Sequence, residues 1–348
     1  LSGWFLVLIA VVSFAAAVYS LGYISADRRE GIITSRESQF YYLLFNLFIF
    51  TMLLTTVLNN LGLVWVAIEL TTLTSAFLVG FYKKGPAVEA AWKYLIICSV
   101  GITLALLGTI LFYYAASLQN QNVSLNWTDL AAGAARLDPN LLKIAFIFIL
   151  VGYGTKAGIA PMHTWLPDAH SQALAPISAL LSGVLLKTAL YAILRFTIIL
   201  NKSAGVSFSS HLFVFLGLVS LVISAGFILI QKDLKRLLAY HSVEHIGIIL
   251  IGLGLGGPLG LYGALLHTFN HAVTKALMFF SAGDIVRKYQ THDMHSIRGV
   301  IKDMPFTGTM ILLGSFALAG SPPFSIFLSE LIILIAGFTQ GAYFTGFV

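Results

Sequence analysis

The sequence predicts an all-α polytopic membrane protein with ten or eleven transmembrane helices, two of them discontinuous. Three observations support this fold class. Hydrophobic residues make up 58% of the 348 residues and charged residues only 10%, a composition typical of membrane chains. Apolar runs of about 20 residues, enough to cross a bilayer, recur from one end to the other. Lysine and arginine gather in alternate loops between these runs, as topology signals do.

The apolar runs predict the helices in order. We expect crossings at 1–23, 38–57, 61–81, 88–116, 142–165, 173–200, 209–231, 237–255, 259–284 and 306–337, and an eleventh that begins near Gly341. The first run lacks the basic residues of a signal peptide, so it is expected to be a helix. Nothing resembles a soluble domain, and residues 1–348 are expected to form one transmembrane domain.

Charge in the loops predicts the orientation. If every run crosses once, five loops lie on one side, at 24–37, 82–87, 166–172, 232–236 and 285–305. These loops hold most of the basic residues, and the other side receives only Arg136, Lys202 and the helix-edge Lys143. Because Lys and Arg accumulate on the cytoplasmic side, the basic loops are expected to be cytoplasmic, in an inner membrane. The net charge of +6 is spread over these loops, so we expect no nucleic-acid partner.

Two of the predicted helices contain breaks. Three glycines and a proline surround Lys156 within residues 152–161, and residues 320–323, Gly-Ser-Pro-Pro, precede Glu330. Proline removes a backbone donor, and unwound backbone at membrane depth persists only against protein or a water-filled cavity. Broken helices hold ion sites in transporters. A packing kink explains one break, but two breaks beside ionisable residues favour a functional site.

Eight ionisable side chains lie inside the predicted crossings: Glu69, Lys93, Lys156, Lys187, His267, His271, Lys275 and Glu330. A charge at the bilayer centre costs about 2.5–3.5 kcal/mol on insertion scales. A chain that carries so many is expected to use them, and the usual use is to move an ion, most often a proton. The alternative is a scaffold in which these charges are merely paired.

Two lysines and a polar stripe predict a proton relay. Lys156 and Lys187 lie near the middle of successive helices, where desolvation lets a lysine release its proton near neutral pH. His267, His271 and Lys275 are spaced i, i+4, i+8, so they form one helix face about 12 Å long. Histidine titrates near neutrality and can shuttle protons.

Haem ligation is a competing interpretation of the histidines. It requires a facing histidine at matching depth, and the candidates His241 and His245 are expected near the cytoplasmic end of their helix, a poor match. Cys98 is the only cysteine, and the nine histidines come without a Cys/His cluster of the kind that binds structural zinc. We therefore expect no cofactor, no metal site and no catalytic residue of the chain's own.

Glu69 and Glu330 are the two carboxylates of the set. Glu69 is expected to be protonated unless it is paired, and Lys93 on the next helix is a candidate partner. The ionisable groups thus form a series with a carboxylate at each end. Protonation at one group changes the proton affinity of its neighbours, so such a series can pass protons along.

Several motifs of the sequence resemble those of a known family. The run from Lys156 through Pro161 and Trp165 to His170, with the following run from Pro176 to Lys187, resembles the core of the proton-translocating membrane subunits of respiratory complex I and the Mrp-type cation/proton antiporters. The runs around Glu69, 233–242, 267–275 and 320–330 resemble further motifs of that family, in the same order, and the resemblance covers about residues 40–340.

The resemblance implies roles for the eight residues. Glu69 would be a charged switch near a neighbouring subunit, with Lys93 as an additional polar link. Lys156 would be the channel lysine beside the first break. Lys187 and the stripe of His267, His271 and Lys275 would form a central hydrophilic axis, and Glu330 would take the terminal position. Family subunits usually have about fourteen helices, so this chain is expected to be a fragment of such a subunit.

The resemblance also implies a function. We expect a proton-translocating subunit of a redox-driven respiratory complex, of hydrogenase or NADH/quinone oxidoreductase type, possessing no redox centre itself. The sequence around Glu69 and Lys93 is similar to that of subunits of group 4 nickel–iron hydrogenases such as hydrogenase-4 component F. Expected partners are other membrane subunits, including antiporter-like neighbours, and a peripheral redox arm. The alternatives are an Mrp-type Na⁺/H⁺ antiporter subunit without redox coupling and a haem-bearing membrane anchor.

Overall fold

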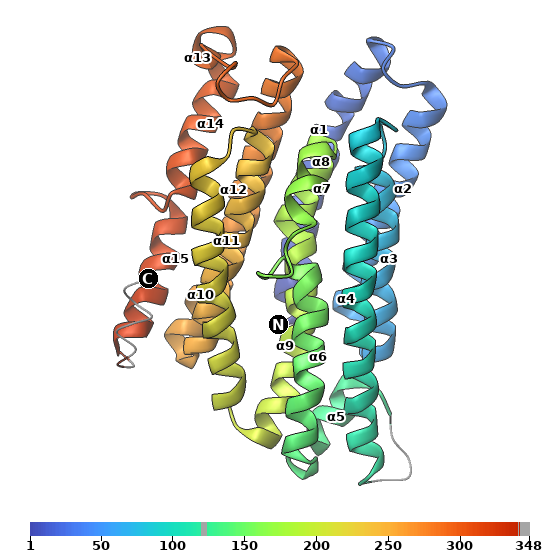
Figure 1. The fold of residues 1–348 in the computed structure, drawn as a ribbon, viewed down its shortest axis with the longest axis vertical. Coiled ribbons are helices and arrows are strands. Elements are labelled where there is room, and N and C mark those ends of the chain that lie inside the picture. The colour runs from blue at the N-terminus through green and yellow to red at the C-terminus, as the bar shows by residue number, and fades with distance from the viewer. Residues whose placement is uncertain (120–123, 340, 342–348) are drawn as a thin grey trace.

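The chain is a helical bundle in which nearly every long segment runs along one axis (Figure 1). The computed structural model describes residues 1–119, 124–339 and 341. The helices are α1 (Ser2–Arg29), α2 (Ser35–Val57), α3 (Leu61–Val79), α4 (Gly85–Ser117), α5 (Trp127–Gly133), α6 (Pro139–Ala157), α7 (Leu166–Gln172), α8 (Ala175–Leu180), α9 (Leu186–Ala204), α10 (Ser207–Ile230), α11 (Leu234–Leu255), α12 (Gly257–Tyr289), α13 (Val300–Asp303), α14 (Pro305–Leu318) and α15 (Ser325–Thr339). A 3₁₀ turn, η1 (Ala134–Arg136), follows α5, and a π-helical turn, η2 (Leu181–Leu185), joins α8 to α9.

The predicted crossings are confirmed, so the chain is an all-α polytopic membrane protein. Eight segments of the described chain are long and apolar enough to span a bilayer. Helix α12 is 33 residues long, but His267, Asn270, His271 and Lys275 lower its hydropathy. Helices α14 and α15 are each shorter than a full span, and together they occupy the run 306–337 that was predicted as the tenth crossing. The expected eleventh crossing near Gly341 lies outside the described residues.

The connections alternate between the two ends of the bundle. Figure 1 places the α1–α2, α3–α4 and α10–α11 connections and α13 at one end, and α5 with the α9–α10 and α11–α12 connections at the other. Residues 166–172, expected as a loop, instead form the mostly buried helix α7. Lys235, counted among the basic loop residues, is also buried, and its Nζ donates to the carbonyl of Ala173 over 2.7 Å.

Both predicted breaks occur. Helix α6 ends at Ala157 because Gly158 takes a left-handed conformation (φ 74°), and the chain resumes as α7 only at Leu166. Gly320 (φ 62°) and the two prolines after Ser321 separate α14 from α15. The π turn within 181–185 is a third irregularity, which the sequence does not predict. π turns inside helices are frequent at functional sites.

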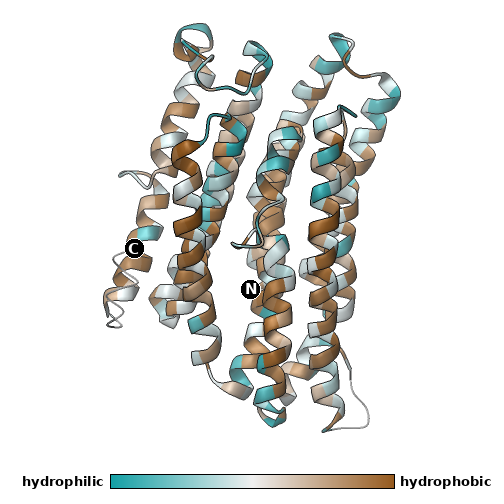
Figure 2. Cartoon of the chain, in the orientation of Figure 1, coloured by the Kyte–Doolittle hydropathy of each residue, from teal (hydrophilic) through white to brown (hydrophobic). Residues whose placement is uncertain are grey.

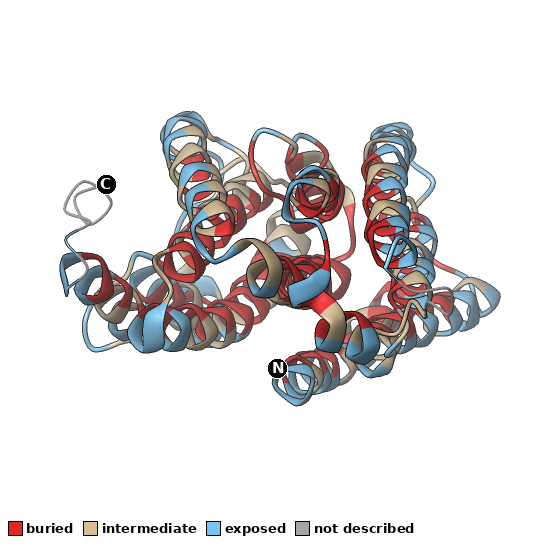
Figure 3. Ribbon diagram, turned by 90° about the horizontal axis from the view of Figure 1, so that it is seen from below, coloured by how far each residue is buried: buried red, intermediate tan, exposed pale blue. Residues whose placement is uncertain are grey.

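The segment formed by α8, η2 and α9 is the centre of the bundle. In its most apolar 18-residue stretch 94% of the residues are buried, whereas the same measure for α10 is 22%. Seen from below, buried residues gather in the interior of the bundle and exposed residues line the outside (Figure 3). Helix α9 packs against α6, and α8 packs against α12. Large apolar side chains such as Phe14, Phe77 and Leu229 point outward, and apolar colour covers most of the length of the helices (Figure 2). This outer surface suits lipid, so the polar residues at the centre require a separate explanation.

Candidate functional site

Lys156 lies in the last turn of α6, just before the first break, and is fully buried. Its Nζ donates to Thr72 Oγ1 over 2.9 Å and to the hydroxyl of Tyr94 over 2.5 Å. The ammonium group also lies 4.6 Å from the centre of the Tyr94 ring, a cation–π distance. Because Thr72 is on α3 and Tyr94 on α4, one lysine joins three helices.

Glu69 is connected to Lys156 through Thr72. Glu69 Oε1 accepts from Ser99 over 2.8 Å, and its Oε2 accepts from the Thr72 hydroxyl over 3.3 Å. The same hydroxyl oxygen accepts from Lys156, so Thr72 bridges an acid and a base. We call Glu69, Thr72, Tyr94, Ser99 and Lys156 the Glu69 cluster.

Lys93 does not pair with Glu69, contrary to the expected partnership. Its side chain is half exposed and forms ion pairs with Glu89 at 2.6 Å and with Asp168 at 3.3 Å. Asp168 also pairs with Arg236 at 2.6 Å. Tyr94 and Cys98 follow on the buried face of α4, whereas Lys93 points outward. The predicted pairing was wrong because adjacent residues of a helix lie on different faces. Tyr94 faces the interior and belongs to the Glu69 cluster, so its neighbour Lys93 faces outward.

Lys187 is held at the π turn. It is fully buried, and its Nζ donates to the carbonyl of Ser182 over 2.5 Å and lies 2.6 Å from Nδ1 of His271. The hydroxyls of Ser182 and Ser242 are 2.7 Å apart, which links the turn to α11. The central lysine therefore contacts the stripe on α12 directly.

Lys275 reaches the same part of α11. Its Nζ donates to the carbonyl of Leu238 over 2.6 Å, and the Ser242 hydroxyl donates to that carbonyl over 3.1 Å. Lys187 and Lys275 thus approach one another through Ser182, Ser242 and Leu238. In the part of the chain that the structure describes, neither these two lysines nor Lys156 forms an ion pair.

The histidines continue from Lys187 toward α15. The rings of His271 and His245 are 4.7 Å apart, His245 Nδ1 lies 2.9 Å from His267 Nε2, and His267 Nδ1 lies 3.0 Å from the Ser329 hydroxyl. His245 therefore matches His267 in depth, which corrects the expectation that it lies too near the helix end. The two rings are stacked 5.0 Å apart and hydrogen-bonded. This leaves no room for a porphyrin between them, so the pair cannot ligate a haem axially.

Glu330 follows Ser329 and is partly buried beside the second break. A Cβ at Gly320 would lie 2.1 Å from Glu330 Oε2. The glycine therefore supplies both the left-handed turn of the break and the space for the carboxylate. We call Lys187, His271, His245, His267, Ser329 and Glu330, with Lys275, the Lys187 cluster.

The structure thus divides the eight predicted residues. Glu69 and Lys156 belong to one cluster. Lys187, Lys275, the two predicted histidines and Glu330 belong to the other, and Lys93 is outside both. Among the described residues no side-chain hydrogen bond joins the two clusters. Sequence reasoning missed the hydroxyls of Thr72, Tyr94, Ser182, Ser242 and Ser329, because such residues are common in membrane helices and only their partners distinguish these five.

The chain is similar in sequence to several known membrane subunits. The chain is 40% identical over 97% of its length to the hydrogenase-4 component F homolog of Methylacidiphilum infernorum, and spans 71% of that protein. It is 32% identical to hydrogenase-4 component B of Escherichia coli over 95% of its length, and 32% identical to NADH-quinone oxidoreductase subunit N of Desulforudis audaxviator over 99%. It spans 49% and 66% of those two relatives, respectively.

Two solved structures share the fold. One is the membrane-bound sulfane sulfur reductase, an archaeal respiratory membrane complex. It matches with a TM-score of 0.87 and 28% identity over 97% of this chain and 66% of the other. The second, an Mrp complex from Dietzia sp., matches with a TM-score of 0.85 and 25% identity over 99% of this chain and 62% of the other. Residues 58–348 match the transmembrane family described as NADH:quinone oxidoreductase/Mrp antiporter, and the chain belongs to that family.

Proposed function

We propose that this chain moves protons across the membrane as a subunit of a redox-driven complex of the hydrogenase or NADH/quinone oxidoreductase type. One observation carries the proposal: Lys187 and His271, two bases in a fully buried position, share a hydrogen bond of 2.6 Å. A buried ammonium without a carboxylate is costly. Since both partners can accept a proton, such a pair holds one proton more readily than two and can transfer it along the bond.

The hydrogen bonds and ring contacts support a route for the relay on the Lys187 side. A proton that reaches Lys187 has His271 within bonding distance, and the ring of His271 lies against His245. His245, His267 and Ser329 form a hydrogen-bonded run that ends beside Glu330. In this proposal the positive charge of Lys275 makes Lys187 release its proton more readily. Glu330 receives the proton at the end of the run.

The Glu69 cluster is proposed as the coupling end. Thr72 joins Glu69 to Lys156, so a change in the charge of Glu69 is felt by Lys156 across two hydrogen bonds. Glu69 is partly exposed on α3 and can respond to a neighbouring subunit. Lys93, which pairs with the exposed Glu89 and the partly buried Asp168, is proposed as a polar link at that surface, outside the buried relay.

The electron-transfer chemistry is proposed to belong to partners. The relatives are named as components of hydrogenase-4 and of NADH-quinone oxidoreductase, and we propose the same setting for this chain. A peripheral redox arm would supply the electrons, and antiporter-like subunits would lie beside this chain in the inner membrane. The basic loops lie at the end of the bundle that holds the α1–α2 connection and α13 (Figure 1), and this end is proposed to face the cytoplasm.

The second candidate is a Na⁺/H⁺ antiporter subunit without redox coupling, favoured by the fold match to the Mrp complex. Inverted vesicles that contain the whole complex distinguish the two. Under the redox proposal, an electron donor produces ΔpH, and an inhibitor of the redox arm abolishes it. Proton exchange that depends on sodium and needs no electron donor would overturn the redox proposal and support the antiporter.

Thr72→Val tests the bridge between Glu69 and Lys156. Valine keeps the shape but removes the hydroxyl, and a hydrogen bond to a charged group contributes about 1.5–3 kcal/mol. We expect the rate of ΔpH formation to fall roughly tenfold, with less effect on the redox turnover. Thr72→Ser, which restores the hydroxyl, is expected to recover most of the rate. Equal rates for the valine and serine variants would show that the hydroxyl has no part in coupling.

A further inference from the structure

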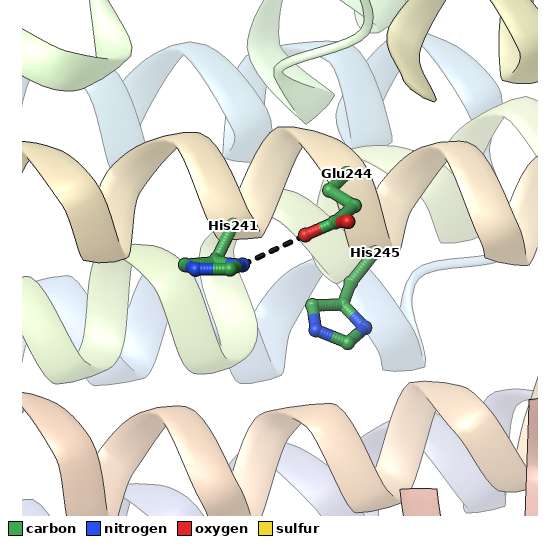
Figure 4. A group of neighbouring side chains, drawn as sticks. All are labelled: His241, Glu244 and His245. Atoms are coloured by element: carbon green, nitrogen blue, oxygen red, sulfur yellow. Dashed lines mark hydrogen bonds and ion pairs between the residues drawn. The ribbon is translucent and has the colours of Figure 1, made fainter. Parts of the chain in front are cut away.

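A group of side chains on α11 lies outside the relay and has the composition of a transition-metal site. His241, Glu244 and His245 are spaced i, i+3, i+4, so they share one helix face. One potential ligand atom of each lies within 4.8 Å of the others. In Figure 4 the carboxylate of Glu244 lies between the two imidazole rings, and the bond from His241 Nδ1 to Glu244 Oε2 is 2.7 Å.

The hydrogen bonds around His245 fix which ring nitrogen is available. The Ser329 hydroxyl donates to the carbonyl of Ile326 over 2.8 Å, so its oxygen accepts from His267 Nδ1–H. A neutral His267 then presents an unprotonated Nε2, and His245 must donate to it through Nδ1–H. His245 Nε2 is consequently left with a free lone pair.

That lone pair has no partner. His245 Nε2 is buried and makes no hydrogen bond among the described residues. A buried polar atom without a partner is unusual and requires an explanation. A ligating histidine typically donates its other ring N–H to a fixed acceptor, which holds the tautomer and the ring orientation. His267 plays that part for His245, so the ring is already arranged as a ligand.

A cavity gives access to these groups. It has a volume of about 510 Å³ and is lined by His241, Glu244 and His245 on α11 and by Glu330 on α15. His241 and Glu244 are partly exposed, with 22% and 30% of their side-chain surface accessible. Glu244 brings one negative charge to the site, and the Glu330 carboxylate on the facing helix would offset more of the charge of a divalent cation when it is ionised.

We propose that His241, Glu244 and His245 bind a divalent zinc ion that inhibits proton movement. Two imidazoles and one carboxylate are a common zinc ligand set that leaves the fourth position open. Ligands of a tetrahedral zinc ion lie ~3.3 Å apart, so small side-chain rotations complete the site. The cation would replace the proton between His241 and Glu244 and occupy His245 Nε2. The inhibition rests on the proposed relay, because His245 lies between His271 and His267, whereas the binding does not.

Zinc binding is measured on the purified whole complex by equilibrium dialysis against radioactive Zn²⁺. The wild-type complex is expected to bind one equivalent more per chain than the double variant His241→Gln/Glu244→Gln. His211→Gln, an exposed histidine on α10, is the matched control and should retain that equivalent. Each single variant, His241→Gln and Glu244→Gln, is expected to bind roughly 100-fold more weakly. Equal zinc content in wild type and double variant, with all variants assembled, would overturn the site.

Inhibition is measured separately, as the fraction of each complex's own untreated ΔpH formation that survives added Zn²⁺. The concentration for half-inhibition is expected to rise roughly 100-fold in His241→Gln and to stay unchanged in His211→Gln. Zinc that binds at the site but leaves ΔpH formation intact would support the site and overturn the inhibition. A complex that forms no ΔpH without zinc would instead contradict the proposed function, so the two failures are distinct.

Discussion

Vesicles carrying the complex with Lys187→Met are expected to lose nearly all ΔpH formation while electron transfer continues at a reduced rate. Methionine fills a similar volume but cannot carry a proton. Among the described residues, the substitution also removes the one hydrogen bond that the imidazole ring of His271 makes. A positioned proton-transfer group contributes about 100-fold or more to a rate, so the initial rate of acidification should fall by about that factor. The measurement is acidification of inverted vesicles, with redox turnover recorded in parallel.

The control is Lys288→Met, which changes an exposed lysine near the end of α12. It is expected to leave both acidification and turnover at the wild-type level. Assembly of each variant complex is checked by its content of partner subunits. If an assembled Lys187→Met complex acidifies vesicles at the wild-type rate, the lysine is structural and the relay proposal fails, although the family membership stands.

Much of the fold followed from hydropathy because each crossing must present an apolar surface to lipid. The ten crossings and both breaks were predictable from run length and from glycine and proline. The π turn was not, because 181–185 reads Leu-Ser-Gly-Val-Leu, which is compatible with an ordinary helix. It is evident only in the structure, where Lys187 follows the turn and contacts Ser182 and His271.

The candidate site was predictable in composition but not in connection. An ionisable residue is easy to recognise within a run of apolar residues, which is why Lys156, Lys187 and the stripe on α12 were identified from the sequence. Pairing depends on helix rotation, which hydropathy constrains weakly when a helix is apolar on every side. Lys93 and Glu69 were therefore matched wrongly, and His245 was misplaced in depth. The Thr72 bridge needed three helices in register, which no single segment encodes.

Replacing Gly152 with alanine is expected to separate α4 from α6 and so displace Lys156. A Cβ at Gly152 would lie 2.4 Å from the backbone nitrogen of Ala105 and 2.6 Å from the carbonyl oxygen of Gly101. Both are main-chain atoms of α4, so a side-chain rotation cannot relieve the clash and one helix has to shift. Small residues at such contacts let membrane helices approach closely. Inserting one methyl group into a tight interior typically costs about 1–3 kcal/mol.

Lys156 is one turn beyond Gly152 on the same face of α6, and its partner Tyr94 is on α4. The shift therefore lengthens the hydrogen bond between them, and ΔpH formation should fall together with the thermal stability of the solubilised complex. Gly226→Ala is the matched control, since a Cβ there meets no atom within 4 Å and alanine favours a helix by about 0.5–1 kcal/mol. That variant should be as stable as wild type or slightly more so. A Gly152→Ala complex with the melting temperature and acidification rate of the control would show that α4 and α6 are less tightly packed than the structure indicates. In that case Lys156 would not depend on their contact.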